Sequence, residues 1–203
     1  MKIGYSKKVM ELFLNPKNVG VLKDADVTAL TGSVACGDMI KLYLKIRGDV
    51  IEKITFESYG CAANIATSSM ITEMVKGKRI DYARKISLKD ELNEIGGLPK
   101  VKYHCAVLAI KALRIALDKW DVMNGKKKLD EEFVKNLLRG ILDPSTGKDI
   151  VSAGIIKKIK IRENKIEIDA NLPDDKEYKN EIVSNIKELF EKMEVKIEVK
   201  NAI

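Results

Sequence analysis

The chain has 203 residues, of which 45% are hydrophobic, 5% aromatic and 33% charged, and its formal net charge is +7. This length suits one large or two small domains with mainly aliphatic cores, and the longest apolar runs fall far short of the ~20 residues that span a bilayer. The first residues also lack the apolar core of a signal peptide and the composition of a transit peptide. We therefore expect a cytoplasmic protein that does not bind membranes.

The positive charge is unevenly distributed, because most of the basic excess lies in residues 1–125. A basic excess can indicate nucleic-acid binding. Here the basic residues are scattered, and the few aromatic residues are not interleaved with them as a base-stacking surface would require. We therefore expect a solvated surface that can meet an acidic protein partner, and no nucleic-acid binding.

The first half of the chain predicts a helix, a three-stranded antiparallel meander and a series of further helices. Apolar and polar residues alternate strictly from Ile40 to Ile46, which is typical of a strand with one buried face, and Arg47-Gly48-Asp49 is a hairpin signal. Strands are expected at about residues 27–35, 40–46 and 50–59. The helical spacing of apolar residues predicts helices at about 5–14, 62–75, 80–86, 88–95 and 101–120.

The pattern restarts after a linker at Asn124-Gly125-Lys126-Lys127-Lys128. The order that follows is helix, strand, strand, helix, strand, at about residues 130–138, 155–161, 165–170, 175–193 and 195–199. The sequence therefore predicts an α+β protein with two domains, residues 1–125 and a small α-β-β-α-β domain at residues 126–203.

The chain contains three cysteines, Cys36, Cys61 and Cys105. An odd number without a secretion signal argues against a disulfide framework and favours metal binding or thiol chemistry. Free cysteines are often small buried hydrophobic residues, but each of these three lies at a break between predicted elements. Cys61 and Cys105 lie near helix N-termini, where the partial positive charge is expected to lower a thiol pKa.

Two further residues are candidate ligands. Asp38 follows Cys36 by two positions and could close its turn or supply an oxygen ligand. His104 is the single histidine and precedes Cys105 directly; neighbouring helical residues point ~100° apart, so both could bind one ion only with a distorted backbone. Such a set could close a tetrahedral zinc site or hold an iron–sulfur cluster. A Cys–His nucleophilic enzyme is an alternative, but no orienting partner can be identified.

Several separated motifs occur in order along residues 1–122. They are Tyr5-Ser6, Asn15-Pro16-Lys17-Asn18-Val19-Gly20, Cys36-Gly37-Asp38, Tyr59-Gly60-Cys61, Ile65-Ala66-Thr67-Ser68-Ser69, Leu98-Pro99, Lys102 and His104-Cys105. Together they resemble the U-type iron–sulfur scaffold family, which comprises IscU and the N-terminal domain of NifU.

The resemblance implies a non-enzymatic scaffold that builds a transient two-iron, two-sulfur cluster ([2Fe-2S]). Its cluster ligands would be Cys36, Cys61 and Cys105. Asp38 and His104 would be the auxiliary ligand or residues that promote cluster exchange, and Lys102 would be a nearby cation. A cysteine desulfurase would supply sulfur, and apo iron–sulfur proteins would receive the cluster. A homodimer holding one cluster is also compatible with this family.

The spacing of the cysteines indicates which branch of the family the chain resembles. The alternative is a SufU-like sulfur acceptor that binds Zn²⁺, but that branch has an insertion between its second and third cysteines, and the interval from Cys61 to Cys105 is short.

The family's chaperone-docking sequence Leu-Pro-Pro-Val-Lys reads Leu98-Pro99-Lys100-Val101-Lys102 in this chain. An Hsp70/J-protein chaperone is thus an implied partner whose docking motif is altered at Lys100.

The second domain has its own set of motifs, namely Leu142-Asp143-Pro144, Gly147, Asp149-Ile150-Val151, Gly154-Ile155-Ile156 and the strand containing Ile159 and Ile161. These motifs resemble the PaaD/SufT-like domain of metal–sulfur cluster assembly factors. The family's Cys-Pro is replaced here by Asn171-Leu172-Pro173. We therefore expect an accessory role in docking or targeting, or a stabilising or dimerising one, and no thiolate ligand from this domain.

Overall fold

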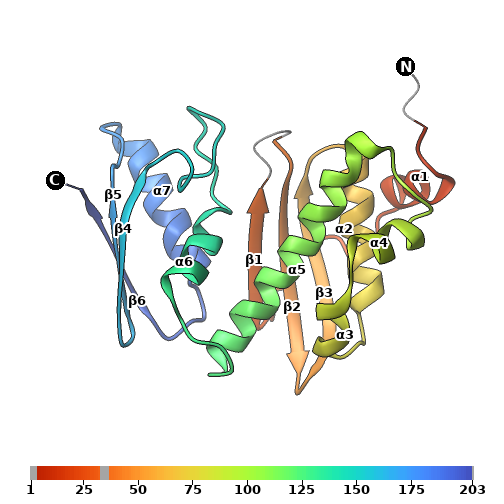
Figure 1. Ribbon diagram of the computed structural model, residues 1–203, viewed down its shortest axis with the longest axis horizontal. Coiled ribbons are helices and arrows are strands. Elements are labelled where there is room, and N and C mark those ends of the chain that lie inside the picture. Colours follow the sequence, from red (N-terminus) through yellow and green to blue (C-terminus); the bar gives the residue numbers. More distant parts are fainter. Residues whose placement is uncertain (1–3, 33–36, 203) are drawn as a thin grey trace. The chain divides into compact units, whose positions relative to one another are not determined.

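The structure is a computed structural model that describes residues 4–32 and 37–202. It divides into two compact units, one ending at Lys119 and the other beginning at Trp120. The division falls inside the long helix α5 (Tyr103–Met123), because the last turn of this helix belongs with the second unit. The α+β class expected from the sequence is confirmed, since each unit combines one sheet with helices (Figure 1).

The first unit contains an antiparallel sheet of order β1-β2-β3. Its strands are β1 (Val27–Gly32), β2 (Met39–Arg47) and β3 (Val50–Tyr59). The alternation read from Ile40 to Ile46 corresponds to β2, whose apolar side chains are buried. The three-stranded meander is therefore confirmed.

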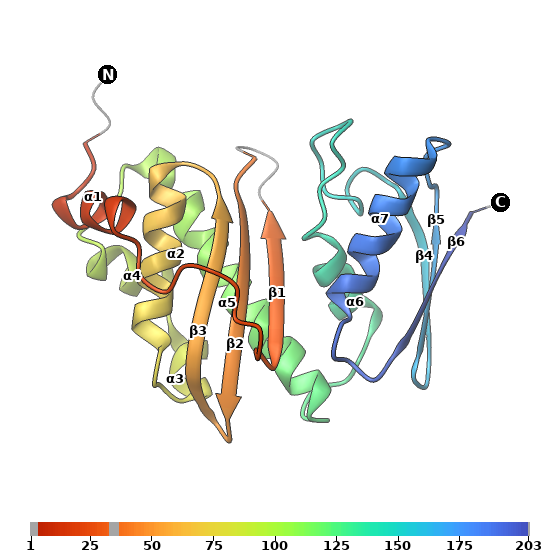
Figure 2. The same ribbon diagram turned by 180° about the vertical axis from the view of Figure 1, so that it is seen from behind.

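The helices of the first unit follow the sheet, apart from one that precedes it. They are α1 (Lys7–Leu14), α2 (Ala62–Val75), α3 (Ile80–Lys85), α4 (Leu88–Glu94), the short 3₁₀ helix η1 (Lys100–Lys102) and α5. Figure 2 shows α5 crossing behind the sheet, while α2 packs along β3. Helix α5 begins at Tyr103, two residues later than expected, because the chain leaves Pro99 through the tighter turn of η1.

The second unit has the expected α-β-β-α-β order. Its elements are α6 (Glu131–Leu138), β4 (Ile156–Arg162), β5 (Lys165–Ala170), α7 (Lys176–Leu189) and β6 (Lys196–Asn201). The sheet order is β4-β5-β6, with β4 antiparallel and β6 parallel to β5. Helix α7 ends at Leu189, earlier than expected, and the chain then turns through Lys192 with a positive φ of 66°.

No helix in the described part of the chain is both long enough and apolar enough to cross a membrane.

Candidate metal centre

The site lies where the ends of β2 and β3 meet the first turns of α2 and α5. In the sheet, Met39 pairs with Tyr59, so Asp38 lies beside the Gly60–Cys61 step that leads into α2. Cys61 is the N-cap residue of α2, and Cys105 lies in the first turn of α5. Segments far apart in the sequence thus converge on one small volume.

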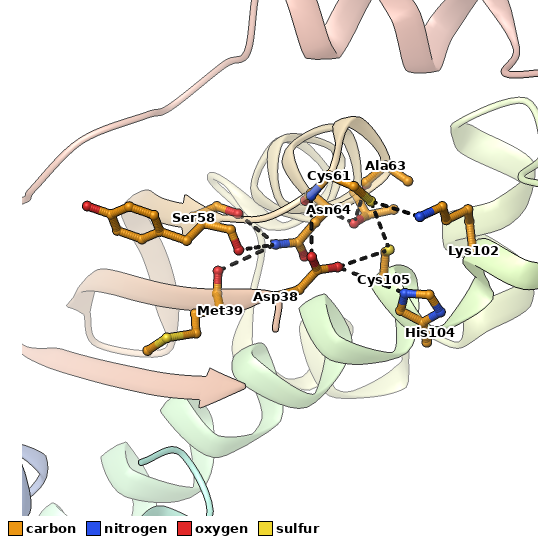
Figure 3. Close-up of polar contacts among 11 residues, drawn as sticks. Asp38, Met39, Ser58, Cys61, Ala63, Asn64, Lys102, His104 and Cys105 are labelled. Carbon is orange, nitrogen blue, oxygen red and sulfur yellow. Dashed lines mark hydrogen bonds and ion pairs between the residues drawn. The ribbon is translucent and has the colours of Figure 1, made fainter. Parts of the chain in front are cut away.

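Asp38, Cys61 and Cys105 form a compact group whose potential ligand atoms all lie within 4.8 Å of one another (Figure 3). The two sulfur atoms are 3.8 Å apart. The Cys105 thiol donates to Asp38, with Sγ and Oδ2 3.5 Å apart, and the Cys61 backbone N–H donates to Asp38 Oδ1 over 3.3 Å. The carboxylate therefore links the two cysteines.

His104 and Lys102 border this group. His104 Nε2 lies 3.9 Å from Asp38 Oδ2, and it has no hydrogen-bond partner among the described residues although the atom is buried. The same Asp38 oxygen therefore faces both His104 and Cys105, which occupy the first turn of α5. Lys102 places Nζ 3.5 Å from Cys61 Sγ.

The electrostatics differ from the expectation at one cysteine. The pKa of Cys105 is raised well above its ordinary value of 9.0, first because the thiol is buried and then because Cys61 and Asp38 lie beside it. The expectation that a helix N-terminus lowers this pKa is therefore wrong for Cys105, since desolvation exceeds the effect of the helix. The pKa of Lys102 is raised, first by the charge of Cys61, which keeps this side chain cationic.

Asn64 and Gly60 support the group in a way that sequence reasoning missed. Asn64 is fully buried, and its Nδ2 lies 2.8 Å from Ser58 Oγ, 3.2 Å from Tyr59 O and 3.4 Å from Met39 O (Figure 3). It thus ties the start of α2 to the ends of both strands. The signal in the sequence was an amide side chain in the first turn of α2.

Gly60 is required by close packing. A Cβ atom at this position would lie 2.5 Å from Asp38 Oδ1 and 2.6 Å from Asn64 Nδ2, closer than real Cβ contacts. The absence of a side chain at Gly60 therefore lets Asp38 and Asn64 approach the backbone before Cys61. The sequence indicated only that Gly60 ends a strand.

Cys36 lies outside the described residues, so its assignment as a ligand stays a prediction.

The fold and the group of thiol, carboxylate and imidazole side chains define the first unit as a small α+β domain with a metal-binding type of site. The chain belongs to the family of NifU-like N-terminal domains, whose family model matches residues 4–127. A second family model, described as iron–sulfur cluster assembly protein, matches residues 131–200. Both resemblances expected from the sequence are confirmed.

Two named relatives and one solved structure are also similar to this chain. The chain is 49% identical over 122 residues to the iron–sulfur cluster assembly scaffold protein IscU 1 of Archaeoglobus fulgidus, covering 60% of this chain and 80% of that protein. It is 44% identical over 128 residues to the scaffold protein IscU of Aquifex aeolicus, covering 62% and 82% respectively. A crystal structure of a nitrogen-fixing NifU-like protein (N-terminal) from Brucella abortus has a TM-score of 0.45 at 24% identity, covering 55% and 90%.

Proposed function

We propose that this protein is a scaffold on which an iron–sulfur cluster is assembled and from which it is passed to apo-proteins. The observation that carries the proposal is the convergence of Asp38, Cys61 and Cys105, whose ligand atoms lie within 4.8 Å of one another. The named relatives are scaffold proteins, which supports a carrier role for this chain without a catalytic step of its own. The same names do not favour the SufU-like alternative.

The donor set suits iron held by thiolates. Two thiolates on one tetrahedral ion with metal–sulfur bonds of about 2.3 Å lie about 3.8 Å apart, and the Cys61 and Cys105 sulfur atoms are 3.8 Å apart. The separation of these two sulfur atoms therefore suits binding to a single tetrahedral ion. We infer that a first iron ion binds here before the cluster is completed, and that Zn²⁺ can occupy the same position.

Metal binding changes the bonding of Asp38. The Cys105 thiol donates a hydrogen bond to Asp38 Oδ2. A metal ion needs the thiolate, so the Sγ–H proton must leave and Asp38 loses this hydrogen bond. The carboxylate oxygen then becomes available as a ligand, while His104 Nε2, 3.9 Å away, is the competing nitrogen ligand.

The remaining assignments follow from the family. We propose Cys36 as the third thiolate, a [2Fe-2S] cluster as the cargo, a cysteine desulfurase as the source of sulfur, and apo iron–sulfur proteins as recipients. The cytoplasm as the site of action and an Hsp70/J-protein chaperone as a partner belong to the same proposal. Lys102, next to Cys61 Sγ, would attract an anionic persulfide during sulfur delivery.

Anaerobic reconstitution tests the proposal. The full chain would be incubated with ferrous iron, cysteine, a cysteine desulfurase and dithiothreitol as the reductant that converts sulfane sulfur to sulfide, followed by visible absorption and by iron and sulfide analysis. We expect equal amounts of iron and acid-labile sulfide, with strong loss in Cys61→Ser and Cys105→Ser. Asp81→Asn, an exposed acidic residue on α3, serves as the control.

A chain that binds only zinc, and takes up no sulfide after the zinc is removed, would contradict the scaffold function. Cluster formation that survives in both cysteine variants would contradict the proposed ligands instead.

A further inference from the structure

We propose that the second unit binds an extended acidic segment of a protein partner along its edge strand β4. The surface concerned is the basic row, defined as Lys158, Lys160 and Arg162 on β4. This inference goes beyond cluster assembly and does not depend on the metal-binding group of the first unit.

The sheet of the second unit has one apolar and one charged face. Ile166, Ile168 and Ala170 of β5 are buried, and Figures 1 and 2 show α6 and α7 together on one side of this sheet. The strand register places only charged residues on the opposite face. These residues are Lys158, Lys160, Arg162, Lys165, Glu167, Asp169, Lys196, Glu198 and Lys200.

Most of the acidic charge on this face is already neutralised. Lys165 forms ion pairs with Glu167, at 2.7 Å, and with Glu198, and Lys200 lies 3.1 Å from Glu198. The basic row has no ion pair or hydrogen-bonding side-chain partner within residues 4–32 and 37–202. Three cations that form no ion pair among the described residues therefore follow one another along a single strand.

The backbone of β4 adds a second binding element. This strand is at one edge of the sheet, and among the described residues its ladder hydrogen bonds go only to β5. An edge strand can accept a further strand from another polypeptide. The basic row recurs at every second residue, about 6.8 Å along the strand, which is also the spacing of alternate carboxylates on a paired strand.

A polypeptide fits these features better than a nucleic acid. The N–H and C=O groups on the outer edge of β4 can pair in register with the backbone of another polypeptide, which a nucleic acid does not offer. The charged face also carries no aromatic ring for base stacking. The occupant is therefore an acidic segment in strand conformation.

Fluorescence anisotropy with a labelled peptide tests the proposal on the full chain. The probe is a peptide of about nine residues, a long strand, in which glutamate alternates with threonine. The triple substitution Lys158→Gln, Lys160→Gln and Arg162→Gln should weaken binding by about tenfold or more. The matched control removes the same charge elsewhere through Lys23→Gln, Lys53→Gln and Lys128→Gln, three exposed lysines, and should change affinity less than about twofold.

Two further probes separate strand pairing from plain charge attraction. A peptide of the same composition with its glutamates grouped together should bind more weakly than the alternating one. N-methylation of alternate peptide amides should abolish binding in one frame and be tolerated in the other, because only one edge of the peptide faces β4.

Unchanged peptide affinity in the triple variant, with its circular dichroism spectrum preserved, would overturn the proposal. If that variant only aggregates more, the basic row protects an exposed strand edge and binds no partner. Equal tolerance of N-methylation in both frames would exclude strand pairing, and tighter binding of a single-stranded oligonucleotide through the same residues would assign the surface to nucleic acid.

Discussion

The Cys105 thiol donates a hydrogen bond to the Asp38 carboxylate, with the thiol sulfur 3.5 Å from Oδ2. Both side chains are almost completely buried. This pair is the least solvent-exposed part of the metal centre, and its proton must leave before a metal ion can be bound by both residues.

Replacing Asp38 with alanine should lower the pKa of Cys105. Burial, the largest cause of the raised pKa, would remain in part, but the charge and the hydrogen bond of Asp38 would be lost. The rate of Cys105 alkylation, followed by mass spectrometry as a function of pH, measures this change. Glu57→Gln, on β3 and away from this pair, is the control, and an unchanged alkylation profile in Asp38→Ala would contradict the assigned coupling.

Metal affinity should rise with pH. Because the pKa of Cys105 is raised, the metal-free protein holds the thiol proton at neutral pH, and each binding event must release it. Zinc titrations in buffers of different ionisation enthalpy would measure the protons released. Fewer protons should be released in Cys105→Ser than in the unchanged chain; equal numbers would show that Cys105 is not a ligand.

Gly60→Ala should destabilise the first unit and weaken metal binding. The added methyl group would overlap Asp38 Oδ1 and Asn64 Nδ2, and such overpacking costs about 1–3 kcal/mol. Thermal unfolding and zinc affinity measure the two effects. Gly4→Ala is the control, because a Cβ there meets nothing within 4 Å. The double variant Gly60→Ala, Asn64→Ala should be less destabilised than the sum of the two single variants, because Asn64→Ala removes one of the two clashing groups.

Asn64→Asp should be more harmful than Asn64→Ala. Asn64 Nδ2 faces three acceptors, namely Ser58 Oγ, Tyr59 O and Met39 O. Alanine leaves them without their donor, at about 1–3 kcal/mol, whereas aspartate adds a buried charge close to carbonyl oxygens. Denaturant unfolding ranks the variants, and equal stability of the two would contradict the role of Asn64 as a donor.

Glu91→Leu should stabilise the protein at neutral pH. Glu91 on α4 is fully buried, and neither carboxyl oxygen has a hydrogen-bond partner among the described residues. Burial raises its pKa well above the ordinary 4.5. The folded state therefore binds the Glu91 proton more tightly than the unfolded state does. The resulting stabilisation of the fold is complete below pH 4.5 and is lost as the pH rises through the raised pKa of the folded state.

The substitution should accordingly raise the free energy of unfolding by about 2 kcal/mol at pH 7 and flatten its fall as the pH rises above 4.5. Thermal unfolding across this range provides the measurement. Glu94→Leu, an exposed position one turn away on the same helix, is the control. A pH profile unchanged by Glu91→Leu would show that Glu91 ionises freely in the folded state.

Much of the fold could be predicted because it follows from local patterns. Helix α2 begins at Ala62, where strand alternation changes to a run of helix-forming residues, and it ends at Val75. Strand β5 likewise begins at Lys165, directly after a turn in which Glu163 has a positive φ of 48°. The parallel pairing of β6 with β5 could not be predicted, because it depends on where α7 returns the chain.

The sequence predicted which residues form the site, but not how burial and contacts between segments change their properties. Neighbours in the sequence identified Cys61, Cys105, Asp38 and His104 as candidates, and the structure brings them together. The raised pKa of Cys105 depends on burial by other segments, so local sequence pointed in the wrong direction. The support from Asn64 likewise depends on the pairing of Met39 with Tyr59, which no local pattern shows.

The two cysteines of the described site differ in exposure, because Cys105 is buried and Cys61 is partly exposed. An incoming thiol of a recipient protein can therefore reach the metal from the Cys61 side first. Of these two ligands, Cys61 should be replaced before Cys105. The protein would thus keep hold of its cargo through the buried sulfur until the recipient has already bound it.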